Sequence, residues 1–314
     1  MRALVAAPNR PGQFEIRDVP EPSPRPDQAL VEVRATSLNL GEVRWLMGSR
    51  DGARLGWDLA GVVAEPAADG SGPYAGARVV GMVGDEVGQF LRLGSTGAWA
   101  ERVAVPTNTL SEIPDELSFR DASTLPVAGL TAYRTLVLGG SLLGRRVLIT
   151  GASGGVGRFL IQLARLSGAH VTAVANRTAG LAELGADDVL TTLEPAGQTF
   201  DHILESVGGE SLAAAVGRLA SGGMLVIFGN SSQRPTTISG FMGKEGATIY
   251  VFLVFVEVAR HASGDRDLNL LARLMAAGSL IPQVDLEVSW REAGSAFQAL
   301  LERRVSGKAV LNID

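Results

Sequence analysis

The sequence of 314 residues contains no cysteine. This absence excludes disulfide bonds, a thiolate zinc site and a cysteine nucleophile. Histidine is scarce too: His170, His202 and His261 are scattered over the second half, without the spacing of a metal-ligand set. His170 lies just before a predicted strand and His202 begins another, so we interpret them as ordinary strand-end residues. The sequence therefore disfavours metal catalysis, and we expect no metal site.

Three further features are missing. The 28 Lys and Arg residues do not outnumber the 33 Asp and Glu residues, and the net charge of −5 argues against a nucleic-acid partner. The longest apolar run, residues 249–256, is far too short to span a bilayer. The N-terminal residues lack the layout of a signal peptide. We therefore expect a cytoplasmic protein with neither a membrane nor a nucleic-acid partner.

The chain does have the composition of a protein with a substantial core. Its hydrophobic fraction is 46% and its mean hydropathy is +0.19, which argues against disorder. Because 314 residues exceed the length of a typical single domain, we expect two domains.

A glycine-rich turn follows an apolar strand at residues 146–157, RVLITGASGGVG. Its spacing A-x-G-x-x-G lets backbone approach a dinucleotide pyrophosphate, and the helix that follows directs its free N–H groups and positive dipole end at the phosphates. The alternative is a tight strand–helix turn that binds nothing. The flanking strand and helix favour the dinucleotide. The predicted contact residues are Ala152, Ser153, Gly154, Gly155, Val156 and Gly157.

The pattern of elements changes near residue 120. Before it, strands are predicted at 28–36, 58–65, 77–83 and 99–105, separated by Gly, Pro and Asp clusters. After it, predicted strands at 147–150, 171–175, 188–190, 202–206 and 223–228 alternate with helices at 156–167, 179–184 and 212–219. This alternation is typical of a doubly wound parallel sheet. Helices at 268–277 and 290–303 and a strand at 309–313 then return to the first domain. We place one domain at 1–120 plus 268–314 and the other at 121–267.

Nine segments, in this order, resemble one known family. They are VEVRATSLNLGEV, DLAGVV, GARVVGMV, GAWAERVAVP, LPVAGLTAYRTL, GASGGVGRFLIQLARLSGAHVTAVA, LGADDVL, FDHILESVGG and GKAVL. Together they resemble the zinc-independent quinone oxidoreductases of the medium-chain dehydrogenase/reductase superfamily. The resemblance implies an α/β protein in which a GroES-like, β-rich substrate domain is split around a Rossmann domain, with the active site between them. It also implies NADPH-dependent reduction of a quinone or an activated C=C bond, and a homodimer joined through the nucleotide-binding domains.

Zinc-dependent relatives hold catalytic metal with an early Cys and the His of a G-H-E segment. Here that segment is Gly56-Trp57-Asp58, and the Cys position falls within Asn39–Glu42. Without a metal as Lewis acid, alcohol oxidation through a metal-bound alkoxide would lose its main source of charge stabilisation. Quinones and enones accept hydride at carbon and place negative charge on a distant oxygen. A few hydrogen-bond donors and a proton from solvent can stabilise that charge.

The end of the second Rossmann strand predicts which dinucleotide binds. An NAD site usually has an acidic residue there, but this chain has Asn176, nineteen positions after Gly157, followed by Arg177. The missing carboxylate and the added guanidinium both suit a 2′-phosphate. The alternative is that Arg177 is a solvated surface arginine. We predict NADPH as the cofactor.

The remaining cofactor contacts are predicted from the resemblance and from the sheet edge. Thr131 matches a position beside the nicotinamide, although it could equally be a helix N-cap. Val207–Gly209 follow one strand at the carboxyl edge of the sheet, where ligands bind in such folds. The other predicted contacts, which follow the next strand, are Phe228, Gly229, Asn230 and Ser231. Phe252 and Leu253 either line the nicotinamide site or form a buried edge strand at the dimer, and we favour the edge strand.

The sequence leaves the proton donor and the acceptor open. Many family members have a tyrosine a few residues after the asparagine matched by Asn39, and this chain has none there. Asn39 could orient a carbonyl, and Arg44 could stabilise an enolate or quinolate oxygen as a permanent cation. Glu42 could simply cap a helix, so we expect solvent to supply the proton. The short polar segment Gly48–Gly56 lies beside the expected substrate entrance. An enoyl reductase of polyketide-like intermediates and a cofactor-binding regulatory protein with little turnover are the alternative functions.

Overall fold

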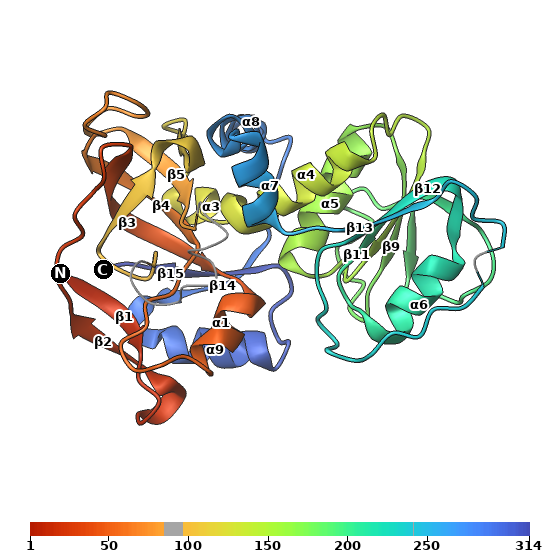
Figure 1. Ribbon diagram of the computed structural model, residues 1–314, viewed down its shortest axis with the longest axis horizontal. Coiled ribbons are helices and arrows are strands. Elements are labelled where there is room, and N and C mark those ends of the chain that lie inside the picture. Colours follow the sequence, from red (N-terminus) through yellow and green to blue (C-terminus); the bar gives the residue numbers. More distant parts are fainter. Residues whose placement is uncertain (85–96, 241) are drawn as a thin grey trace. The chain divides into compact units, whose positions relative to one another are not determined.

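The computed structural model describes residues 1–84, 97–240 and 242–314, and these form two compact units (Figure 1). The first unit is Met1–Leu130 with Val254–Asp314, and the second is Thr131–Leu253. The sequence placed the boundaries after residues 120 and 267. The first unit also contains α3 (Phe119–Ala122), the π-helical turn η3 (Leu125–Gly129) and α7 (Val254–His261). α3 and η3 pack on strands of the first unit, a tertiary contact that composition does not reveal.

The first unit is built on a mostly antiparallel sheet around the long strand β3 (Gln28–Leu38). Its order in the described residues is β14-β15-β3-β4-β5-β7, with β6 also paired to β3. The other strands are β4 (Asp58–Glu65), β5 (Arg78–Met82), β6 (Arg102–Pro106), β7 (Leu110–Glu112), β14 (Val284–Ser289) and β15 (Lys308–Asn312). Because β15 pairs antiparallel with β3, the end of the chain completes the first domain, as expected.

Two helices from opposite ends of the sequence share one core of the first unit. α1 (Leu40–Leu46) contributes Val43 and Leu46, and α9 (Ala293–Leu301) contributes Phe297. The hairpin of β1 (Arg2–Ala6) and β2 (Phe14–Asp18) adjoins the same cluster, and α8 (Gly264–Ala276) packs against β7 and η3.

The second unit is a parallel sheet with the order β10-β9-β8-β11-β12-β13 in the described residues. Its strands are β8 (Arg146–Thr150), β9 (His170–Val174), β10 (Asp188–Leu190), β11 (Phe200–Glu205), β12 (Leu219–Ile227) and β13 (Thr248–Val251). Counted from β8, this is the strand order 3-2-1-4-5-6 of a Rossmann domain. Together with the β-rich first unit, it confirms the predicted α/β class with a split GroES-like domain.

Three helices accompany this sheet: α4 (Leu130–Leu138), α5 (Gly155–Leu166) and α6 (Gly209–Gly217). The helix predicted at 179–184 is wrong, because those residues form only turns. Gly180 and Gly185 have φ of +78° and +109°, which are left-handed and end any helix after less than two turns. No helix in the described parts of the chain is long and apolar enough to cross a membrane.

Candidate functional site

The glycine-rich turn between β8 and α5 has the geometry that a pyrophosphate requires. Gly151 has a φ of +60°, and a Cβ there would collide with the Ser206 hydroxyl. At Gly157 a Cβ would lie 2.6 Å from the Gly151 carbonyl oxygen, so this glycine lets α5 pack against the turn. Gly154 differs, because its φ of −82° suits any residue and a Cβ would have only one atom within 4 Å. Internal structure therefore makes little demand for glycine at 154, and this face of the turn leaves room for a ligand.

The start of α5 offers donors to such a ligand. Gly154 is the N-cap, and Arg158 makes the first intrahelical bond by donating its N–H to the Gly154 carbonyl at 3.0 Å. The N–H groups of residues 155–157 therefore have no partner within the helix. No acidic residue occupies the first turn. The turn thus fits a dinucleotide pyrophosphate, which would be held by these amides and by the helix dipole.

The carboxyl ends of β11 and β12 bring the next predicted contacts together. The Ser231 amide donates to the Ser206 carbonyl oxygen at 3.0 Å, and the Ser232 amide donates to that of Val207 at 2.8 Å. The loop containing Val207 therefore lies against the loop of Phe228–Ser231. This is the sheet edge at which Rossmann domains bind ligands.

Glu205 connects β8, the loop after β11 and α6 at this edge, and the sequence analysis did not identify it. Its fully buried carboxylate accepts hydrogen bonds from the hydroxyls of Thr150 and Ser211 and from the amides of Val207 and Gly208, at 3.0–3.2 Å. The donors come from β8, the loop and α6. The available signal was an acid at the end of the segment FDHIL, three residues before the first of two glycines.

Thr131 is the second residue of α4 and is almost completely buried. η3 runs into α4 without a break, because Leu130 has helical φ and ψ and its amide bonds to carbonyls of residues 125–127. Thr131 therefore does not begin a helix, which excludes the N-cap interpretation. Asn176 and Arg177, in contrast, follow β9 on the exposed surface.

Phe252 and Leu253 directly follow the edge strand β13, which ends at Val251. Phe252 is buried and its amide donates to the Ile227 carbonyl oxygen at 2.8 Å, whereas Leu253 is partly exposed. His202 is fully buried inside β11 instead of at a strand end, with its Nε2 2.9 Å from the Thr135 carbonyl oxygen. Burial lowers the pKa of this imidazole.

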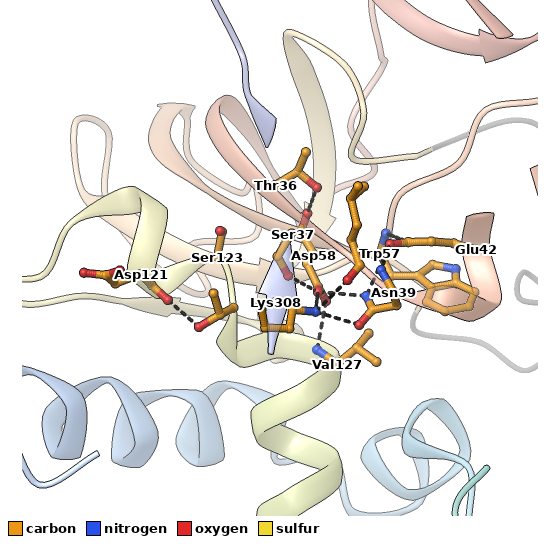
Figure 2. A network of polar contacts seen from close by, with 12 residues as sticks. Thr36, Ser37, Asn39, Glu42, Trp57, Asp58, Asp121, Ser123, Val127 and Lys308 are labelled. Carbon is orange, nitrogen blue, oxygen red and sulfur yellow. Dashed lines mark hydrogen bonds and ion pairs between the residues drawn. The ribbon is translucent and has the colours of Figure 1, made fainter. Parts of the chain in front are cut away.

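In the first unit, a buried ion pair joins the start of β4 to β15 (Figure 2). Asp58 is fully buried and Lys308 is 3% exposed, and Nζ lies 3.3 Å from Asp58 Oδ2. The same Oδ2 accepts the Ser37 hydroxyl at 2.5 Å, and Oδ1 accepts the Val127 amide of η3 at 2.8 Å. These donors satisfy both oxygens of the buried Asp58 carboxyl group.

Asn39 connects this pair to a second buried carboxyl group. Its Nδ2 donates to Asp58 Oδ2 at 2.9 Å and to Glu42 Oε1 at 3.3 Å, while its Oδ1 accepts Lys308 Nζ at 2.7 Å. Both amide hydrogens and the amide oxygen are thus engaged within the unit. This geometry suits a residue that positions α1 better than one that binds a substrate carbonyl.

Glu42 belongs to the same cluster and closes the N-terminus of α1. Its Oε1 accepts the Asn39 amide at 2.6 Å and its Oε2 accepts the Trp57 amide at 2.9 Å. Complete burial, followed by the negative charge of Asp58, raises the pKa of Glu42 from 4.5 to about 8. One ammonium and two carboxyl groups would carry a net negative charge if all were ionised, and a proton on Glu42 removes it.

The indole of Trp57 lies where α1 begins. A Cβ on Gly41 would be 3.1 Å from the far edge of the indole, and the ring makes edge-to-face contacts with Trp45 and Phe255 at centroid distances of 5.4 and 5.2 Å. Arg44 does not belong to the buried cluster. Partial burial and the like charge of Arg303, which follows α9, lower the pKa of Arg44.

Two family models match the chain. The model described as "Alcohol dehydrogenase GroES-like domain" matches residues 25–115, and the model described as "Zinc-binding dehydrogenase" matches residues 181–311. The chain is 30% identical to the mouse protein "NAD(P)H oxidoreductase RTN4IP1, mitochondrial", covering 92% of this chain and 82% of that protein. The quinone oxidoreductase from Coxiella burnetii superimposes with a TM-score of 0.83 over 100% of this chain and 99% of that chain, at 26% identity. The chain belongs to the zinc-independent quinone oxidoreductase family of the medium-chain dehydrogenase/reductase superfamily.

A polyketide synthase is also similar. The chain is 32% identical to the "Spectinabilin polyketide synthase system protein NorB" of Streptomyces orinoci, covering 92% of this chain. It spans only 13% of the length of that protein.

Trp57 bears on whether this site could hold a zinc ion. By the resemblance, Trp57 stands in the segment where zinc-dependent relatives have a His ligand, and an indole offers a donor but no lone pair to a metal. Within the described residues, no group of three or more His, Cys, Asp or Glu side chains could hold a metal ion. Asp58 and Glu42 are fully buried and hold protein donors instead.

Proposed function

We propose that this protein is an NADPH-dependent oxidoreductase that reduces a quinone or an enone without a metal. The observation that carries the proposal is the indole of Trp57, which packs against Gly41, Trp45 and Phe255. By the resemblance, its segment Gly56-Trp57-Asp58 corresponds to the G-H-E segment in which zinc-dependent relatives have a His ligand. Reduction of a conjugated acceptor is the chemistry of this superfamily that needs no Lewis acid. NADPH, when bound, supplies the hydride.

The chain's own residues would bind and orient that cofactor. The amides at the start of α5 would hold the pyrophosphate, with Gly154 leaving room for it. Arg177, with no acid at Asn176, would bind the 2′-phosphate, which supports NADPH over NADH. The loops of Val207 and Phe228–Ser231, held together by the bonds around Glu205, would position the nicotinamide, with Thr131 as a further contact.

The reduced acceptor also needs a proton. The described tyrosines do not belong to the buried cluster, and Glu42 is completely buried with both oxygens bonded to amides. We therefore propose solvent as the proton source. Arg44 as a stabiliser of negative charge on the acceptor stays a prediction, because only its position on α1 is established.

A second candidate is an enoyl reductase acting on a polyketide-like thioester. The similarity to NorB favours it, and the hydride chemistry is the same. The difference lies in the acceptor: a small quinone is planar and uncharged, whereas an enoyl intermediate is carried as a thioester.

The test is a steady-state panel of NADPH and NADH against benzoquinone, naphthoquinone, a simple enone and crotonyl-pantetheine, with EDTA present in a parallel series. We expect NADPH oxidation with quinones or enones that EDTA does not change. Preference for crotonyl-pantetheine would establish the enoyl reductase instead. Tight NADPH binding without turnover of any acceptor would identify a cofactor-binding regulatory protein, and inhibition by EDTA would contradict the metal-free mechanism.

A further inference from the structure

Arg158 is an unusual residue for the first half of a buried helix. It is the fourth residue of α5, directly after the last glycine of the turn, and is only 7% exposed. A buried guanidinium must have its donors satisfied, and the identity of its acceptors shows what the side chain holds in place.

The guanidinium connects two loops of the second unit. Its Nε donates to the Ser153 carbonyl oxygen at 3.3 Å, and an Nη donates to the Ala179 carbonyl oxygen at 3.1 Å. Ser153 belongs to the pyrophosphate turn, and Ala179 lies two residues after Arg177. A Cβ on Gly180 would be 3.4 Å from the other Nη, so that loop closes tightly over the guanidinium.

The loop that Arg158 contacts is held internally by backbone turns, among them the Leu181 amide bonded to the Thr178 carbonyl oxygen at 3.2 Å. Residues 176–185 form turns without a helix, and residues 176–179 are exposed. Leu181 is buried and anchors the loop from beyond Gly180. The bond from Arg158 to Ala179 therefore fixes the half of the loop that contains Asn176 and Arg177.

Arg158 also contributes charge. A guanidinium stays protonated in a protein, so Arg158 places a positive charge beside the loop of Asn176 and Arg177. A permanent cation beneath this loop stabilises a dianionic 2′-phosphate and does little for an uncharged 2′-hydroxyl.

We propose that Arg158 is a specificity-determining positioning residue: it ties the loop of Asn176 and Arg177 to the pyrophosphate turn and thereby selects a 2′-phosphorylated dinucleotide. This inference rests on the proposed preference for NADPH. It adds a residue outside the loop itself, and it explains why an arginine is suited to this helix position, since its planar fork reaches two carbonyls in different directions.

The experiment compares Arg158→Gln, Arg158→Lys and the matched control Arg165→Gln with the wild type. Arg165 lies on the same helix in its last turn, where it is exposed and paired with Asp187 at 3.2 Å. The measurements are KM and kcat with NADPH and with NADH, together with the Kd of 2′,5′-ADP and of 5′-AMP. Circular dichroism and thermal melting establish that each variant is folded.

We expect Arg158→Gln to raise KM for NADPH and Kd for 2′,5′-ADP about tenfold, the range of one charge-assisted contact, with the NADH and 5′-AMP values changed less than about threefold. Arg158→Lys should recover little of the loss, because the two carbonyls are bonded by different nitrogens, Nε and an Nη, and lysine has a single nitrogen at its tip. Arg165→Gln should behave as wild type.

Equal losses of affinity for the phosphorylated ligands, NADPH and 2′,5′-ADP, and for the unphosphorylated ones, NADH and 5′-AMP, would overturn the inference. Arg158 would then be a purely structural residue. Unchanged values in Arg158→Gln, or full recovery in Arg158→Lys, would overturn the tethering role. These outcomes are distinct from failure of the proposed function: a wild type that uses NADH as well as NADPH refutes the cofactor proposal, whereas a wild type that prefers NADPH and keeps its preference in Arg158→Gln refutes only the role of Arg158.

Discussion

Asp58 and Glu42, the two carboxyl groups of one buried cluster, have different hydrogen-bond donors around them. Asp58 receives an ammonium, a hydroxyl, a side-chain amide and a backbone amide. Glu42 is fully buried and lies in the field of Asp58, so its pKa rises to about 8, although the amides of Asn39 and Trp57 that it accepts act against this rise. The cluster therefore holds one proton, on Glu42, near neutral pH.

This proton makes the stability of the fold depend on pH. Between pH 4.5 and about 8, the folded state holds a proton on Glu42 that the unfolded state has released. The contribution of Glu42 is thus complete below pH 4.5 and is lost as pH rises, at about 1.4 kcal/mol per pH unit across this window. Urea unfolding at pH 5, 6, 7 and 8 should show this decline in the wild type and a flatter profile in Glu42→Gln. Parallel profiles for the two proteins would contradict the assignment.

At the scale of elements, the turn between β8 and α5 contains one glycine that packing requires, Gly157, and one that packing does not require, Gly154, where we predict that the ligand binds. Gly157 contacts the backbone of the turn, whereas Gly154 has an ordinary φ and an open face. The same residue type in one motif therefore has two physical causes.

Two substitutions distinguish these causes. Gly157→Ala should lower the free energy of unfolding by about 1–3 kcal/mol through overpacking. Gly154→Ala should change stability by less than about 1 kcal/mol while raising KM for NADPH about tenfold, because its methyl group meets the ligand. Chemical denaturation and steady-state kinetics measure the two effects. A Gly154→Ala variant with wild-type cofactor binding would show that no ligand approaches this face.

Most elements were predictable where an apolar pattern had one regular period. β4 and β10 have the bounds that the sequence indicated, and α5 differs by one residue at each end. Short half-exposed strands were missed, among them β14, where only alternate side chains are exposed. The helix predicted at 179–184 was wrong because Gly180 and Gly185 adopt left-handed backbone conformations, which the apolar spacing does not indicate. Local pattern does not report such tertiary and backbone constraints.

At the scale of the whole molecule, the edge of the Rossmann sheet carries the prediction of a homodimer. β13 is the last strand in the sheet order of the described residues, and its Ile249 and Val251 are 43% and 77% exposed. An exposed apolar edge strand favours pairing with a second copy. The cytoplasmic location likewise stays a prediction.

Analytical ultracentrifugation tests the dimer. We expect a dimer for the wild type and a shift toward monomer for Val251→Lys, because a charged side chain at the edge disfavours pairing. Leu143→Lys is the matched control, since Leu143 is 79% exposed in the loop before β8. A monomeric wild type, or an equal effect of both variants, would contradict an interface at β13.

The sequence by itself determined the family, the two-domain organisation and the dinucleotide turn, because these depend on local periodicity and on residues close together in the chain. It also predicted that Trp57 stands in the segment where zinc-dependent relatives have a His ligand. Only the tertiary structure decided three things: which donors surround Asp58 and Glu42, that every polar group of the Asn39 side chain is hydrogen-bonded, and that Arg158 bonds to the loop of Arg177. Those properties depend on partners brought from distant segments, such as Lys308 on β15 and Ala179 beyond β9. Burial and long-range pairing create them, and no local pattern records either.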